Sequence, residues 1–276
     1  MMMGLQAAIA TMDAPQRLQE LAYRIPYHYL PVAEGGRFSQ HEYWSWGYRY
    51  LGRLEVALSL LGQHPFASLL DIGCGDGRFL REVRRRFARP RLLGIDVSEN
   101  AVRWARALNP GLEFQTLDLL ERRLDEQFDA VTLLEVVEHV SPERLPDVLR
   151  AAAAHLRPGG RLVLTTPHTN MRLDPRHFQH FDRARLCALL EPDFDRISCT
   201  PFDYVDWPTR ALLQMLGGSG RFFLVTHAGL NAWFFRRYMK RRLYGSGESG
   251  CQRLAVAARK RAAPPDAGGG PAAGTD

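Results

Sequence analysis

The stretch LLDIGCGDGRFL, residues 69–80, decides the fold class. An apolar run ends in a loop with three glycines, Gly73, Gly75 and Gly77, and a segment with helical spacing follows. Glycine allows a backbone to turn tightly and to approach a ligand closely. The pattern therefore predicts a strand, a glycine turn and a helix, with a ligand bound beyond the end of the strand.

The same alternation continues outward from this stretch. Short apolar runs predict strands over 67–73, 91–96, 112–118, 128–135 and 161–167. Helical spacing predicts helices over 77–87, 98–108 and 141–156, and the motif RPGG is expected to end the last of them. Ser98 and Ser141 are expected N-caps, with Pro142 in the first turn. Strands separated by helices of this length pair in parallel through crossover helices, which makes the fold class α/β.

The rest of the chain completes the expected architecture. Helices are expected over 182–191, 207–217 and 229–242, and strands over 194–201 and 251–260. The prediction is a Rossmann-like, seven-stranded, mostly parallel sheet with helices on both faces. A helical N-terminal lid is expected over 1–48 and a domain over 49–261, with a helical insertion at about 205–245. Residues 262–276 are rich in Pro, Gly and Ala and predict a disordered tail.

Composition restricts the class of protein. The chain has 276 residues, of which 46% are hydrophobic, enough to bury a sizeable core. The formal charge of +6 permits anionic partners but does not require them. Four scattered cysteines without a C-x-x-C pair favour a reducing cytoplasm. We expect no secretory signal and no spanning helix, and a cytoplasmic protein that can lie peripherally at the inner face of the membrane.

The glycine spacing argues against a dinucleotide site. That site requires G-x-G-x-x-G, so that pyrophosphate lies on the helix N-terminus. Here the third glycine comes one position early, and Arg78 stands where the last glycine is required. Asp71 lies just before the turn, where a carboxylate suits a cationic ligand group better than a pyrophosphate.

In these motifs the chain resembles the class I S-adenosylmethionine-dependent methyltransferases. Their first motif is similar to LLDIGCGDGRF, and LRPGGRLVLTTP matches a later helix-turn-strand. The resemblance implies that Asp71 and the glycine loop hold the methionine part of the cofactor. It also implies that Asp96 bonds the ribose hydroxyls, and that Val97 and Asp118 meet the adenine. The full set of implied cofactor-binding residues is Asp71, Gly73, Cys74, Gly75, Asp96, Val97, Asp118, Leu119 and Glu135.

A second stretch, LLEVVEHV at 133–140, follows the fourth strand and has three interpretations. His139 can act as a general base, because its pKa lies near neutral, with Glu135 and His180 as further catalytic candidates. Alternatively, Glu135, Glu138 and His139 can bind Mg or Mn, with His177 or His180 as a fourth ligand. Finally, the segment can be structural and bond the backbone.

The resemblance divides over the methyl acceptor. E-x-x-E-H followed by a later His is similar to the small-RNA 3′-terminal ribose 2′-O-methyltransferases, which use a divalent metal. QHFDRARL, however, departs from their pattern and resembles bacterial enzymes that act on small molecules, quinone precursors or glycans. The expected function is O-methylation of a small molecule or a sugar or glycan precursor. The alternatives are RNA methylation and a non-catalytic, cofactor-binding scaffold.

Two further segments bear on partners. The N-terminus is rich in aromatic residues, including Tyr43, Trp44 and Trp46, and predicts a lid that either stacks on the acceptor or packs on the sheet edge. Residues 229–242 combine aromatic and basic side chains. This segment can lie on an anionic membrane surface, contact RNA phosphates, or form a solvated helix face.

Overall fold

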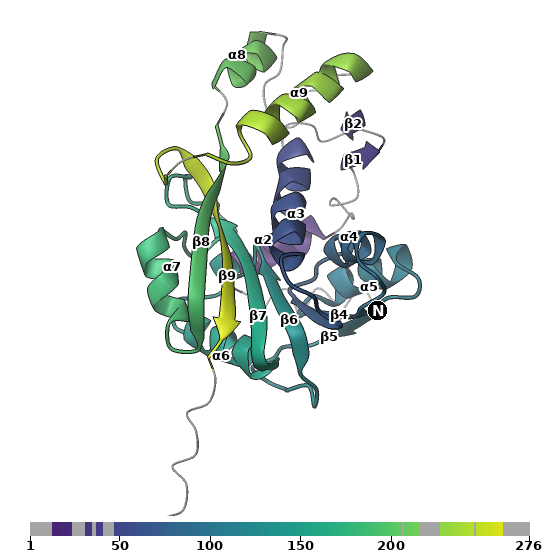
Figure 1. Cartoon of the computed structure of the whole chain (residues 1–276), viewed down its shortest axis with the longest axis vertical. Helices are drawn as coiled ribbons and strands as arrows, with labels where there is room; N and C mark the ends of the chain where they lie inside the picture. The colour runs from purple at the N-terminus through teal and green to yellow at the C-terminus, as the bar shows by residue number, and fades with distance from the viewer. Residues whose placement is uncertain are drawn as a thin grey trace, which may run out of the picture.

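The computed structural model describes residues 13–23, 31–34, 37–40, 47–205, 207–215, 227–245 and 247–261. Its centre is a seven-stranded sheet in the order β5-β4-β3-β6-β7-β9-β8 (Figure 1). The strands are β3 Ser68–Ile72, β4 Arg91–Asp96, β5 Glu113–Thr116, β6 Phe128–Leu134, β7 Leu156–Pro167, β8 Phe194–Tyr204 and β9 Cys251–Lys260. The pairs among β3 to β7 are parallel, and β9 is antiparallel to both β7 and β8. The predicted mostly parallel sheet is confirmed.

Helices cover both faces of this sheet, as predicted. One apolar core joins the strands to α3 Gly47–Leu61, α4 Arg78–Arg86 and α5 Glu99–Leu108. A second core, on the other face, joins them to α6 Leu145–Ala154 and α7 Arg183–Leu190. Because buried apolar area stabilises each helix against the sheet, these two cores fix the strand ends in place.

Local capping confirms one helix start and corrects another. The Ser98 hydroxyl accepts a hydrogen bond from Ala101 N at 3.1 Å, so Ser98 is the N-cap of α5 as predicted. The prediction that Ser141 caps the next helix is wrong. The Ser141 carbonyl accepts from Arg144 N and Leu145 N in a turn, and α6 begins only at Leu145. The RPGG motif lies inside β7, which begins five residues earlier than predicted.

The N-terminal part differs from a purely helical lid. It contains α2 Ala14–Ala22 and a two-stranded antiparallel sheet of β1 Pro31–Glu34 and β2 Arg37–Gln40. The helix α3 follows, in a segment to which the sequence pattern assigned no structure. The aromatic residues 41–46 and the tail 262–276 lie outside the described residues.

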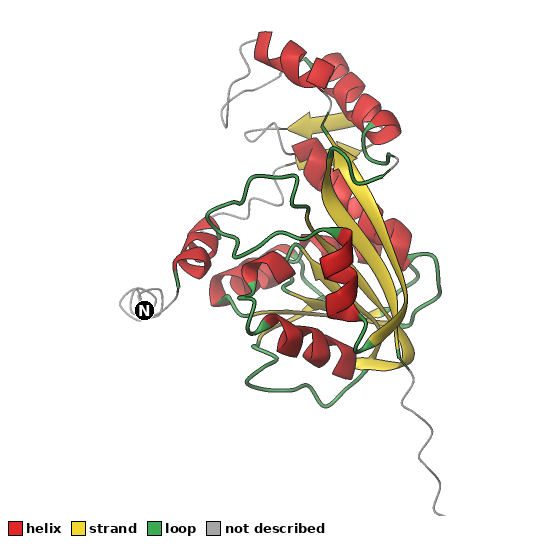
Figure 2. Cartoon of the chain, turned by 90° about the vertical axis from the view of Figure 1, so that its left-hand side faces the viewer, coloured by secondary structure: helices red, strands yellow, loops and turns green. Residues whose placement is uncertain are grey.

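The predicted helical insertion is present as α8 Trp207–Met215 and α9 Ala228–Arg241. Both views place α8 and α9 at the same end of the molecule, beyond the sheet (Figures 1 and 2). No helix in the described ranges is both long enough and apolar enough to cross a bilayer.

Candidate active site

The glycine loop joins β3 to α4 at the carboxyl edge of the parallel strands. Gly73 N and Cys74 N donate to the carbonyl oxygen of Ile95, at 2.8 and 3.0 Å, which ties the loop to β4. Gly73, Gly75 and Gly77 have φ values of 73°, 55° and 79°, in the left-handed region that favours glycine. A Cβ on Gly73 would also lie 2.5 Å from a methyl carbon of Val136. The loop therefore requires glycine both for its conformation and for its contact with the residues after β6.

Asp96 ends β4 directly beside this loop. Its side chain is buried, and its two oxygens accept hydrogen bonds from Gly75 N and Ser98 N, each at 2.9 Å. A carboxylate oxygen can accept more than one hydrogen bond, which is the chemistry that a ligand hydroxyl requires. The next side chain, Val97, is apolar yet 67% exposed. A carboxylate beside an exposed apolar side chain suits a ligand that carries both hydroxyls and a flat ring.

Asp71 lies at the end of β3 beneath the loop. It is buried and accepts a hydrogen bond from the Thr132 hydroxyl at 2.5 Å. The pKa of Asp71 is raised to about 7, chiefly by burial and also by the nearby charge of Asp96, against the hydrogen bond from Thr132, which lowers it. Near neutral pH this carboxyl group therefore exchanges a proton, and a cationic ligand group would favour its charged form.

The remaining implied cofactor residues, Asp118, Leu119 and Cys74, differ in their burial and in their hydrogen-bond partners. Asp118 accepts from Leu120 N at 2.8 Å, and its other oxygen pairs with the exposed Arg144 at 3.1 Å. Leu119 is buried. The Cys74 side chain is also buried, and its thiol donates to the carbonyl of Gly75. Cys74 would therefore contact a ligand through its backbone.

Glu135 was expected as a catalytic, cofactor and metal residue, and one oxygen of its carboxylate pairs with two arginines. Its Oε2 lies 2.8 Å from Arg253 Nε and 3.4 Å from Arg53 Nη1. Burial alone would raise the pKa of Glu135, but the charges of Arg253 and then Arg53 hold it below its usual range. A charged carboxylate paired in this way is a poor proton acceptor. Its other oxygen, Oε1, is buried without a hydrogen-bond partner among the described residues. Glu135 is best described as the anchor of an arginine cluster.

Arg53 is a functional candidate that no sequence motif indicated. It lies on α3, and its Nε is buried without a hydrogen-bond acceptor among the described residues. Burial and then the charge of Arg253 lower the pKa of Arg53 to about 10. An incompletely paired guanidinium that contacts Glu135, directly after β6, is a donor for a ligand carboxylate.

Three residues form the candidate metal centre: Glu138, His139 and His177. One ligand atom from each lies within 4.8 Å of the other two. Of the four expected ligands, Glu138 and His139 belong to this group. His177, which was the alternative fourth ligand, takes the place of His180.

The histidine tautomers follow from the hydrogen bonds around this group. His139 Nδ1 lies 2.9 Å from the Arg176 carbonyl, so it carries the proton and leaves Nε2 with a lone pair. His180 Nδ1 donates to the Met171 carbonyl at 3.2 Å, so His180 Nε2 accepts from His177 Nδ1 at 2.8 Å. His177 therefore also keeps a lone pair on Nε2. Protein groups that fix the distant nitrogen in this way are typical of metal-binding imidazoles.

Glu138 gives the group its anionic member. It is 1% exposed, its Oε2 accepts from the Thr166 hydroxyl at 3.2 Å, and its Oε1 has no partner among the described residues. Burial and then the charge of Glu135 raise the pKa of Glu138 well above its usual range. Burial also lowers the pKa of His139, and that of His177 to about 3. A cation would pair the orphaned oxygen and displace the carboxyl proton.

Two other histidines have structural partners. His180 was expected to act catalytically or as a metal ligand, but both of its ring nitrogens bond to Met171 and His177. Its Nε2 therefore accepts from His177 and helps to orient the His177 ring. His168 pairs with Glu248 at 3.1 Å and accepts from Asn170 N.

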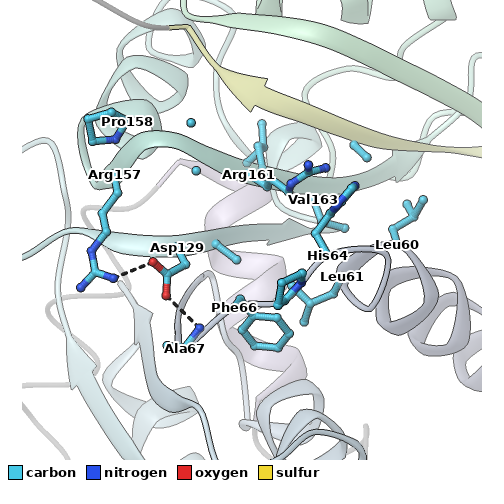
Figure 3. A pocket seen from close by; sticks show the side chains of 16 residues that line it. Leu60, Leu61, His64, Phe66, Ala67, Asp129, Arg157, Pro158, Arg161 and Val163 are labelled. Atoms are coloured by element: carbon cyan, nitrogen blue, oxygen red, sulfur yellow. Dashed lines mark hydrogen bonds and ion pairs between the residues drawn. The ribbon is translucent and has the colours of Figure 1, made fainter.

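A cavity of about 550 Å³ lies at the other edge of the sheet (Figure 3). It is lined by the end of α3 and by the amino ends of β6 and β7, including His64, Phe66 and Arg161. Within it Arg157 pairs with Asp129 at 2.6 Å, and Asp129 also accepts from Ala67 N. The glycine loop and the histidine group lie at the carboxyl ends of the strands, so this cavity is separate from the candidate active site.

Comparisons with known proteins identify the family of the chain. The family model described as "Methyltransferase domain" matches residues 43–193, more than half of the chain. A ubiquinone biosynthesis O-methyltransferase of Aeromonas salmonicida is 39% identical over 111 residues, which are 37% of this chain and 44% of the relative. That of Stutzerimonas stutzeri is 36% identical over 126 residues, which are 42% and 50%. The chain thus spans about half the length of the curated relatives it matches.

Solved structures show the same fold. The N-methyltransferase NodS from Bradyrhizobium japonicum, in complex with S-adenosylhomocysteine, has a TM-score of 0.57 at 15% identity and covers 90% of this chain and 99% of its own. The [4+2]-cyclase SpnF has a TM-score of 0.57 at 18% identity and covers 91% and 98%. At these identities the likeness concerns the fold alone. Together with the family model it shows that the chain belongs to the methyltransferase family, with the class I fold that its glycine motif predicted.

Proposed function

We propose that the protein transfers a methyl group from S-adenosylmethionine to an oxygen of a small molecule. The observation that carries this proposal is the glycine loop with the buried Asp96 and the exposed Val97 at its side. The residues fit the cofactor chemically. The Asp96 carboxylate would accept hydrogen bonds from the ribose hydroxyls, and the exposed Val97 offers an apolar surface for adenine. When bound, the cofactor supplies an electrophilic methyl group.

The polar ends of the cofactor have partners in the same region. Asp71, with its pKa near 7, suits the α-amino group, because a cation beside it stabilises the carboxylate. Arg53 offers the donor that the α-carboxylate requires. Asp118 would accept from the adenine amino group while paired with the exposed Arg144, because a carboxylate oxygen can accept more than one hydrogen bond. These residues would hold and orient the cofactor with its methyl group toward the end of β6.

The residues after β6 would activate the acceptor. We infer that Glu138, His139 and His177 hold a divalent cation such as Mg or Mn. A carboxylate oxygen of Glu138 and a ring nitrogen of each histidine lie within 4.8 Å of one another, and Glu138 Oε1 has no partner among the described residues. The cation would position an acceptor hydroxyl and lower its pKa. In the alternative, His139 Nε2 itself takes the hydroxyl proton.

The relatives favour a small-molecule acceptor over RNA. The curated relatives reported above are named as ubiquinone biosynthesis O-methyltransferases. A glycan precursor remains within the proposed class. The fold by itself does not determine methyl transfer, because SpnF is named as a cyclase. Measured turnover therefore decides between an active methyltransferase and a non-catalytic, cofactor-binding scaffold.

The test uses the full chain with S-adenosylmethionine labelled in its methyl group and catechol as a model acceptor. We expect labelled product with Mg or Mn present, loss of turnover in chelator, and recovery on adding the cation. Glu138→Gln should lose most turnover, while the exposed Glu121→Gln should not. Turnover that persists in chelator would contradict the cation and favour His139 as base. Cofactor binding without turnover on catechol or on glycan acceptors would favour the scaffold.

A further inference from the structure

The excess positive charge of the chain is concentrated in the insertion. Residues 207–245 contain no Asp or Glu and seven basic residues: Arg210, Arg221, Arg236, Arg237, Lys240, Arg241 and Arg242. Since the whole chain has a formal charge of +6, the remainder carries about −1. The insertion is therefore a locally cationic part of an otherwise near-neutral protein.

The helix α9 separates its apolar and basic side chains. Its inner face buries Ala232, Phe234 and Tyr238, and the Tyr238 hydroxyl donates to Asp203 at 2.9 Å. Its outer face exposes Trp233, Arg236 and Lys240, at the three- and four-residue spacing that shares one helix face. The helix is thus packed on one side and presents an aromatic and basic surface on the other.

The helix α8 adds an apolar surface at the same end of the molecule. Trp207, Ala211 and Met215 follow one another at four-residue spacing and are all exposed, Trp207 by 67% and Met215 by 77%. On α9, Trp233 is 42% exposed, and the Arg237 guanidinium carbon lies 5.7 Å from the centre of its ring. Large apolar side chains that lie together on a solvent-exposed surface indicate an interaction site.

We propose that α8 and the outer face of α9 form a docking surface for an anionic lipid bilayer. Tryptophan is favoured at the boundary between headgroups and acyl chains, and lysine and arginine are attracted to anionic headgroups. A nucleic acid would account for the basic side chains but not for the exposed stripe of Trp207, Ala211 and Met215. The lipid surface accounts for both.

The surface lies on the side of the molecule that carries the candidate active site. β8 leads into α8 at its Tyr204 end, and β9 begins after α9, so both helices extend from the carboxyl edge (Figure 2). Tyr238 on the inner face of α9 bonds to Asp203, which pairs with Arg253, and Arg253 pairs with Glu135. A bilayer at this surface would bring a lipid-borne acceptor to the edge where His139 lies.

The test is co-sedimentation of the full chain with vesicles of phosphatidylcholine alone or with about 30 mol% phosphatidylglycerol. We expect binding to the anionic vesicles only, weakened by salt. Each basic side chain near such a surface contributes roughly a factor of five, so the double variant Arg236→Gln with Lys240→Gln should bind about 30-fold more weakly. The matched control is Arg84→Gln with Arg85→Gln, which removes the same charge from exposed positions of α4.

A second readout tests the apolar stripe. Brominated acyl chains should quench tryptophan fluorescence in the wild type, and Trp207→Phe with Trp233→Phe should remove most of that quenching. Equal affinity for neutral and anionic vesicles, equal loss in both double charge variants, or no sedimentation at all would overturn the proposal. S-adenosylhomocysteine affinity should be unchanged in the α9 variant, so failure here leaves the proposed methyl transfer standing.

Discussion

At the scale of single residues, Asp96 is the side chain on which the cofactor site depends most. It holds the glycine loop through Gly75 N and would also accept the ribose hydroxyls. Asp96→Asn keeps the shape but loses the charge that strengthens these bonds. We expect S-adenosylhomocysteine to bind about 30-fold more weakly, measured by calorimetry. Asp147→Asn, on the exposed side of α6, should bind as the wild type does.

Asp71 should make cofactor binding depend on pH. Its folded-state pKa is raised to about 7, above its ordinary value, so the folded protein without ligand holds a proton that a cationic amino group would displace. Binding should therefore weaken as the pH falls below 7, by up to about tenfold per unit. In Asp71→Asn the affinity should be lower but nearly constant from pH 5 to 8. A wild-type affinity that does not change over this range would contradict this role.

The amino-acid sequence indicates a site residue only where that residue belongs to a short motif. Asp71, Asp96 and Asp118 each follow a predicted strand, and parallel strands bring their carboxyl ends to one edge. Arg53 has no such context, because its partner Glu135 lies 82 positions away and α3, the helix that carries Arg53, was not predicted. The replacement of His180 by His177 in the metal group was also hidden, since it depends on side-chain hydrogen bonds within one loop.

At the scale of elements, the glycine loop should tolerate no side chain at Gly73. Gly73→Ala adds left-handed strain and a clash with Val136, together about 2–4 kcal/mol of lost unfolding free energy. Gly111→Ala is the control, because Gly111 has a similar φ of 85° and no neighbour within 4 Å. It should lose only about 1 kcal/mol in denaturant titration.

A second variant separates the clash from the strain. Val136→Ala removes the methyl groups that the new Cβ would meet, so Gly73→Ala with Val136→Ala should be more stable than the two single losses predict. Strictly additive losses would show that Val136 does not set the requirement for glycine.

The elements themselves were largely predictable, and the exceptions have physical causes. The alternation of short apolar runs with helical spacing gave the strands and helices from 67 to 201. The turn at Ser141 was misassigned because serine followed by proline suits a turn as well as a helix start. The start of β7 was predicted five residues too late. The reason is that the RPGG motif at 157–160 is typical of a helix end, whereas in the structure it lies within the first residues of the strand.

At the scale of the whole molecule, Asp203 joins distant elements. It is fully buried, and pairs with Arg49 of α3 and Arg253 of β9, each at 2.8 Å, and with Tyr238 of α9. Burial would raise the pKa of Asp203, but the charges of Arg49 and Arg253 lower it. Both Asp203 and Glu135 also have positive φ values, of 62° and 58°, a conformation that surrounding contacts must hold.

Asp203→Asn should therefore destabilise the fold by about 3–5 kcal/mol, because it leaves buried guanidinium groups incompletely paired. Thermal unfolding measures this loss. Asp195→Asn removes a surface pair with Arg259 and should leave the melting temperature unchanged. Equal melting temperatures for both variants would contradict a central role for Asp203. The sequence could not predict this cluster, since Arg253 and Glu135 are 118 positions apart.

The most direct test of the central claim is calorimetric titration of the full chain with S-adenosylhomocysteine. The account predicts a single site with roughly micromolar affinity, weakened by Asp96→Asn and by Arg53→Met but not by Asp147→Asn. No binding by the wild type, or equal binding by all three variants, would contradict the assignment of the glycine loop as a cofactor site.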